Sequence, residues 1–173
     1  MEKWDILDAN GETVGQKSFS GQTSLKSGEY HLVVHIWIVS NGGKFLIQRR
    51  SEDKRLMPGE WAATGGSAIS RETSFCAAQR ELLEELGLRL IPRKSKCVSR
   101  IKKRNAFLDV WFTLTDEKLE GLRLQPSEVD SVKWVNTAEL KEMIEKGEFH
   151  NYGEEYFNIV LNGAKEFLYE FGN

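Results

Sequence analysis

Alternating apolar and polar residues predict two hairpins in the N-terminal part of the chain. Residues 4–16, WDILDANGETVGQ, alternate around Asn10-Gly11, a dipeptide that readily takes the positive φ values of a tight hairpin turn. Two longer runs at 31–39 and 44–49 are rich in β-branched and aromatic residues, with Asn41-Gly42-Gly43 between them. We therefore expect a small N-terminal hairpin and a larger central one.

The rest of the chain mixes strand and helix patterns. Further strands are predicted at 88–99, 106–115 and 131–135. Asn136 and Glu139 have the spacing of a capping box and should begin a helix. The stretch 154–171, EEYFNIVLNGAKEFLYEF, has the period of an amphipathic helix. Strands interleaved with helices indicate an α/β fold class.

Length and charge narrow the class of protein. A chain of 173 residues that is 40% hydrophobic fits one globular domain over 1–173. Its 24 Lys and Arg against 26 Asp and Glu give a net charge of -2, so we expect neither a nucleic acid polymer nor an anionic membrane as partner. No apolar run approaches the ~20 residues of a membrane span, and a cytoplasmic location is expected.

Two cysteines, Cys76 and Cys97, are too few for a disulfide framework or a zinc site with four cysteines. We expect them to be buried thiols without a chemical role.

The stretch 65–88, GGSAISRETSFCAAQRELLEELGL, predicts an acidic helix that begins near Glu72 and ends at Gly87. One side of this helix should pack on the core; it carries Phe75, Leu82 and Leu86, with Gln79 and Leu83 nearby. Another side carries three carboxylates at neighbouring positions, Glu81, Glu84 and Glu85. Like charges at this spacing repel, and Arg80 or a hard divalent cation would offset the repulsion. Spacing alone also allows a solvated acidic face.

The same stretch matches the motif G-x5-E-x7-R-E-U-x-E-E-x-G-U, in which U is aliphatic, at every defined position. The matching residues are Gly66, Glu72, Arg80, Glu81, Leu82, Glu84, Glu85, Gly87 and Leu88. This motif is the Nudix box, and residues 4 to 146 resemble the Nudix hydrolase superfamily. The resemblance favours a metal site over a solvated face.

The resemblance implies a Nudix-type α/β/α sandwich around a mixed central sheet, with the box forming a loop and helix that bind metal. It implies Mg²⁺ or Mn²⁺ held by Glu81, Glu84, Glu85 and the carbonyl of Gly65, with Arg80 orienting a glutamate and Glu72 in a structural role. The expected reaction is metal-assisted hydrolysis of the pyrophosphate linkage of a nucleoside diphosphate-X or related organic diphosphate.

A further carboxylate in such proteins often comes from a late loop. The segment LQPSEVDSVKWV offers Glu128 and Asp130 just before a strand, and Glu128 is the favoured candidate.

Outside the box, the segments WDILDANGETVG, GEYHLVVHIWIV and LIQRRSEDKRLMPGEW look like the branch related to isopentenyl diphosphate isomerase. Isomerase activity is therefore an alternative. However, the positions of its catalytic cysteine and of two of its metal-binding histidines hold Gly65, Ser67 and Ser24 here, which favours hydrolysis. His31 and His35 are then expected to be strand residues rather than metal ligands.

Arg50 and Lys54 fall where that branch contacts the diphosphate, and guanidinium and ammonium groups suit phosphate oxygens. We predict that they bind substrate, with a solvated basic loop as the alternative. A domain that binds a nucleotide without catalysis is a further alternative, although the intact box argues against it. The sequence names no particular diphosphate, and the N-terminal hairpin and C-terminal helix are candidate surfaces for a homodimer.

Overall fold

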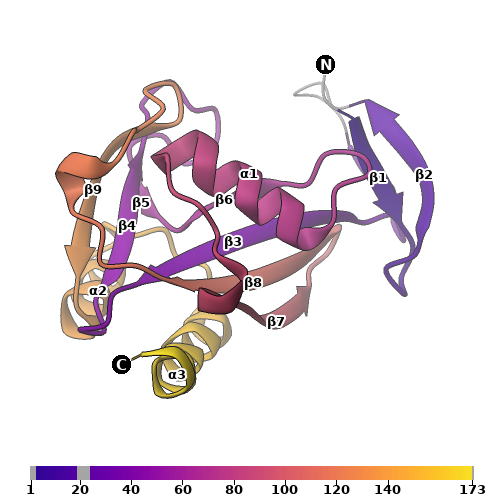
Figure 1. Ribbon diagram of the computed structural model, residues 1–173. Coiled ribbons are helices and arrows are strands. Elements are labelled where there is room, and N and C mark those ends of the chain that lie inside the picture. The colour runs from indigo at the N-terminus through magenta and orange to yellow at the C-terminus, as the bar shows by residue number, and fades with distance from the viewer. Residues whose placement is uncertain (1–2, 19–23, 173) are drawn as a thin grey trace.

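The computed structural model describes residues 3–18 and 24–172 (Figure 1). The strands are β1 Lys3–Leu7, β2 Thr13–Ser18, β3 His31–Val39, β4 Phe45–Arg50, β5 Trp61–Ala62, β6 Thr64–Ser67, β7 Ser95–Lys102, β8 Ala106–Leu114 and β9 Val129–Val135. The helices are α1 Ser74–Leu86, α2 Thr137–Glu145 and α3 Glu154–Phe171, with 3₁₀ turns at Pro92–Lys94 and Leu119–Gly121.

A mixed sheet forms the centre of the molecule. Its main path runs β5-β4-β3-β8-β7, while β6 pairs with β3 and β9 pairs with β4. Strands β3 and β8 run parallel over their whole length, and the other pairs are antiparallel. The strands that carry and flank the box, β3, β4 and β6, therefore lie in the middle of one sheet.

Helices cover both faces of this sheet because β3 is apolar on both sides. Successive side chains of a strand point to opposite faces. Val34 and Ile36 pack in one core with Leu82 of α1, whereas Trp37 packs in a second core with Phe167 of α3. Figure 1 shows α1 and α3 on opposite sides of the sheet. The expected α/β/α sandwich with a mixed sheet is confirmed.

The N-terminal hairpin was predicted correctly and forms its own two-stranded sheet of β1 and β2. In Figure 1 it projects beside the N-terminal end of β3. The first turn differs in part from the prediction, because Gly11 takes positive φ but Asn10 does not. Each hairpin has a three-residue loop in which Gly11 (φ 86°) or Gly43 (φ 74°) supplies the left-handed residue.

Several element boundaries differ from the prediction, including the start of β9 at Val129 rather than 131. The strand expected at 88–99 begins only at Ser95, because Pro92 starts a 3₁₀ turn and cannot donate a ladder hydrogen bond. The box helix begins at Ser74 rather than near Glu72, since Thr73 accepts a hydrogen bond from Cys76 N and caps it. The helix after Asn136 has the expected capping box, and the C-terminal helix spans 154–171 as predicted.

Two predictions about burial were also wrong. Leu83 is 42% exposed, and the core face of α1 instead uses the small residues Ala77 and Ala78 beside its leucines. Cys76 and Cys97 are both exposed rather than buried. Within the described ranges, no helix has the length and apolar character needed to cross a membrane.

Candidate active site

Arg80 of α1 holds the box loop and the box helix together. Its guanidinium donates two hydrogen bonds to Glu72, at 2.8 and 3.0 Å, and one to the carbonyl of Ser67 at 3.0 Å. It also contacts Glu81 at 2.9 Å and Glu84 at 3.2 Å. This bidentate and bridging geometry suits the planar fork of arginine. Arg80 therefore lies where it can orient the carboxylates that follow it in the helix.

The three helix carboxylates lie at different depths. The side chain of Glu84 is 52% exposed, that of Glu81 is 14% exposed, and Glu85 is 3% exposed on the core side of the helix. Burial raises the pKa of Glu81, and the charges of Glu84 and Glu128 add to the effect although Arg80 opposes it. The acidic face thus extends inward from solvent to the sheet.

Glu85 has a partner that sequence reasoning missed. Gln48, which follows three apolar residues in strand β4, donates a hydrogen bond of 2.9 Å to the Glu85 carboxylate. Burial raises the pKa of Glu85 to about 8, opposed by that hydrogen bond and assisted by the charges of Glu81 and Glu128. The available signal for Gln48 was weak, because it is a polar residue between the apolar residues FLI and two arginines.

Two glycines permit the close packing of β6 beneath the helix. Gly65 lies opposite His35 in the ladder between β3 and β6, and a Cβ at Gly65 would collide with the carbonyl oxygen of Val34. A Cβ at Gly66 would collide with the Glu81 carboxylate. The box loop therefore needs glycine at both positions for the carboxylate to lie against the backbone.

The late loop contributes Glu128 but not Asp130. Glu128 forms an ion pair with Lys54, and its carbonyl accepts a 2.9 Å hydrogen bond from Ser51 N. Asp130 is exposed and contacts Arg49 at 3.3 Å on the outer side of β4. The same loop therefore brings one of the two candidate carboxylates to the box and turns the other away.

One cavity of about 780 Å³ collects the remaining candidates, a volume within the range of small-molecule sites. The candidates that line it are Arg50, Lys54, Gly65, Arg80, Glu81, Glu84, Glu85 and Glu128. Residues that sequence reasoning did not assign to the site also line it: Trp4, Leu25, His31, Val33, Asn105 and Gln125. These come from distant segments, and no local pattern marks them.

His31 and His35 lie in β3, as predicted for strand residues. The His35 ring is 2.7 Å from the Tyr156 hydroxyl on the α3 side of the sheet. His31 lines the cavity at the far end of the strand from Trp37.

The donor chemistry of the cavity fits a hard divalent cation. In the described part of the chain no three His, Cys, Asp or Glu side chains form a ready cluster, because Arg80 and Lys54 hold several carboxylates. Nevertheless, burial raises the pKa of Glu81 and Glu85, neighbouring carboxylates add to the shift, and a bound cation would favour the charged form of both groups. Carboxylate oxygens are the ligands that Mg²⁺ and Mn²⁺ prefer.

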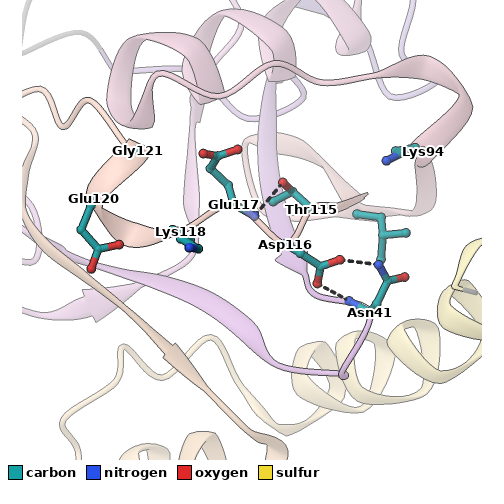
Figure 2. A pocket seen from close by; sticks show the side chains of 9 residues that line it. Asn41, Lys94, Thr115, Asp116, Glu117, Lys118, Glu120 and Gly121 are labelled. Carbon is teal, nitrogen blue, oxygen red and sulfur yellow. Dashed lines mark hydrogen bonds between the residues drawn. The ribbon is translucent and has the colours of Figure 1, made fainter.

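A second hollow, of about 590 Å³, lies at the β3–β4 turn and shares no residue with this cavity. Figure 2 shows that the Asp116 carboxylate there accepts hydrogen bonds from the backbone and side-chain nitrogens of Asn41, the first at 2.9 Å. Asp116 therefore fastens the turn. The hollow is also lined by Glu117 and Glu120 and by two lysines, Lys94 and Lys118, but by no residue of the box.

Comparison with known proteins agrees with the motif. The NUDIX domain model matches residues 29–153. An uncharacterised Nudix hydrolase of Listeria monocytogenes is 38% identical over 88% of this chain and 90% of its own length. Nudix hydrolase 3 of Arabidopsis thaliana is 36% identical over 84% of this chain, a match that covers 20% of the plant protein.

Among solved structures, DR0079 from Deinococcus radiodurans has a TM-score of 0.76 at 23% identity, covering 92% of this chain and 98% of that one. At this identity the likeness concerns the fold alone. The matched domain model, relatives above 30% identity and the intact box together show that this chain belongs to the Nudix hydrolase family.

Proposed function

We propose that this chain is a metal-dependent hydrolase that cleaves the P–O–P linkage of a nucleoside diphosphate-X or a related organic diphosphate. The observation that carries the proposal is the meeting, in one cavity, of four glutamates with Arg50 and Lys54. Carboxylates suit a divalent cation, and cationic side chains suit phosphate oxygens. We also infer that residues 1–173 act as one domain, since the flanking hairpin and α3 both pack on the central sheet region.

Glu81, Glu84 and Glu85, with the carbonyl of Gly65, are the residues we assign to hold Mg²⁺ or Mn²⁺. When bound there, the cation would neutralise phosphate charge and acidify the attacking water. Arg80 keeps Glu81 and Glu84 on the same side of the helix, as its hydrogen bonds at 2.9 and 3.2 Å indicate.

In the proposed reaction, water oxygen forms a bond to one phosphorus and the bridging P–O bond breaks. The water proton passes to a carboxylate, for which we name Glu128, and the second phosphate leaves with the bridging oxygen. Arg50 and Lys54 bind the oxygens of the phosphate farther from the metal. Lys54 would then move from its ion pair with Glu128 to the substrate, which leaves Glu128 free to accept the proton.

The test is a product analysis with Mg²⁺ and a panel of organic diphosphates. Hydrolysis predicts a phosphate-bearing fragment from each side of the broken linkage. Interconversion of isopentenyl and dimethylallyl diphosphate without phosphate release would support the isomerase instead. Tight binding of a nucleotide with no turnover of any diphosphate would support the non-catalytic alternative.

A further inference from the structure

The N-terminal hairpin is fixed to the box loop and to the start of β3. The Asp5 carboxylate accepts hydrogen bonds from Ser70 Oγ at 2.7 Å and from Arg71 N at 2.8 Å, both in the loop before α1. Leu7 and Tyr30 exchange two backbone hydrogen bonds, at 2.8 and 2.9 Å. Asp5 is hydrogen-bonded to the box loop and Leu7 to the residue before β3. The side chains of β1 therefore have fixed positions relative to the carboxylates of the box.

Trp4 precedes Asp5 and stacks on His31 of β3. The two ring centroids are 4.1 Å apart, the planes are inclined by 17°, and Trp4 is 8% exposed. His31 Nδ1 is buried and has no hydrogen-bond partner among residues 3–18 and 24–172. Burial lowers the pKa of His31 to about 4, so the ring is neutral near pH 7. Trp4 therefore holds an uncharged aromatic surface against the strand.

This surface belongs to the same cavity as the carboxylates but lies away from the box glycines. Gly65 pairs with His35, and His31 lies four residues earlier in β3, which is about 13 Å at ~3.3 Å per residue. Leu25, Val33 and Leu56 also line the cavity with apolar side chains; Leu56 is 62% exposed, and its carbonyl accepts a hydrogen bond from Arg50. The cavity therefore combines the carboxylates of the box with an uncharged aromatic surface at the hairpin and further apolar side chains.

We propose that Trp4, with Leu25 and Leu56, binds an apolar or aromatic group attached to the diphosphate and so determines substrate specificity. The proposal rests on the proposed function, which places the diphosphate at the box. We call these three side chains the specificity wall. Trp4 and Leu25 precede residue 29, where the match to the NUDIX domain begins, whereas Leu56 lies within the matched range, so two of the three residues come from outside the matched domain. Both an aromatic ring and an alkyl chain would gain by leaving water against this wall.

Binding can be measured without turnover by isothermal titration of Mg²⁺-loaded protein with methylenediphosphonate monoesters, whose P–C–P bridge resists hydrolysis. The probes are the methyl, octyl and naphthylmethyl esters. We expect wild-type protein to bind the octyl and naphthylmethyl esters more tightly than the methyl ester. Trp4→Ala should weaken those two esters by roughly ten- to hundredfold and leave the methyl ester unchanged. Trp4→Leu should retain the octyl ester better than the naphthylmethyl ester if ring stacking contributes.

Ile6→Ala is the matched control, because Ile6 lies two residues along the same strand, is 4% exposed and does not line the cavity. It should leave all three affinities unchanged. Leu56→Ser changes an exposed side chain and cannot act through the core, and it should selectively weaken the apolar esters.

The proposed role of Trp4 in specificity would be wrong if wild-type protein bound all three esters with equal affinity. It would also be wrong if Trp4→Ala and Ile6→Ala lost the same affinity for the octyl and naphthylmethyl esters. The proposed function would survive those results if organic diphosphates are still hydrolysed. If the protein neither bound any ester nor cleaved any diphosphate, the proposed function would be wrong, and this inference, which rests on it, would be wrong as well.

Discussion

The Glu85 carboxylate of α1 and the Gln48 amide of β4 are joined by a 2.9 Å hydrogen bond inside the protein. Glu85 is 3% exposed because position 85 lies on the core side of the helix, beside Leu82 and Leu86. The bond links the box helix to the strand that ends in Arg50. A carboxylate placed so deeply is costly to ionise, which a divalent cation would relieve.

In metal-free protein, the free energy of unfolding should fall as pH rises from about 4.5 toward about 8. Folding raises the pKa of Glu85 from 4.5 to about 8, so the folded state binds the proton more tightly than the unfolded state. Stability from this group is complete below the unfolded pKa and is lost as pH rises through the folded one. Urea unfolding in chelator, at a series of pH values, measures this slope. Glu85→Gln should flatten it, and identical slopes in both proteins would contradict the assignment.

Glu128→Gln should lower turnover by at least about a hundredfold, the lower end of the typical contribution of a general acid or base. Asp130→Asn is the matched control, since Asp130 lies two residues away and contacts Arg49 outside the cavity. Steady-state rates with one cleaved diphosphate compare the two. If the two variants had equal rates, Glu128 would not be the proton acceptor of the reaction.

Arg50→Ala should weaken substrate binding by roughly ten- to hundredfold, because a charge-assisted contact to phosphate contributes ~1.5 to 3 kcal/mol. Arg50 now donates to the Leu56 carbonyl at 3.0 Å and lines the cavity. Its neighbour Arg49 points to Glu52 and Asp130, so Arg49→Ala should leave KM unchanged. Metal affinity without substrate should be the same in both variants. If Arg50→Ala left kcat/KM unchanged, the basic loop would be a solvated surface without a role in substrate binding.

Arg80→Lys should destabilise the protein by about 1–3 kcal/mol, since an ammonium cannot reproduce the paired hydrogen bonds to Glu72 and leaves partly buried acceptors without a donor. Arg71→Lys is the control, because Arg71 is exposed and its carboxylate contact is made by its backbone nitrogen. Urea midpoints compare the two. If Arg80→Lys had the stability of the wild-type protein, the paired hydrogen bonds of the guanidinium to Glu72 would not contribute to folding.

Local patterns predicted most of the fold because they act over a few residues. The β-branched and aromatic residues of β3 and the capping box at Asn136 are both local signals, and both elements formed as expected. The boundary at Ser95 was missed because the 3₁₀ turn at Pro92 replaced the first part of the strand.

The site was predictable where the motif fixes spacing, since Arg80 and the helix glutamates follow from their positions in the box. Gln48, Trp4 and Leu25 could not be found in this way, because each lies in a segment far from the box in sequence. Trp4 and Leu25 line the cavity, whereas Gln48 contacts its carboxylate Glu85 without lining the cavity itself. Position alone also could not separate Glu128 from Asp130, whose directions depend on the partners Lys54 and Arg49.

The most direct test of metal-dependent hydrolysis is the rate of diphosphate cleavage after removal of metal with a chelator and titration with Mg²⁺. The account predicts no turnover in chelator and saturable recovery in wild-type protein. Glu84→Gln and Glu85→Gln should remain folded but recover orders of magnitude less activity at saturating Mg²⁺. Full turnover in excess chelator, or full activity in either variant, would contradict the assignment of these carboxylates to a catalytic metal site.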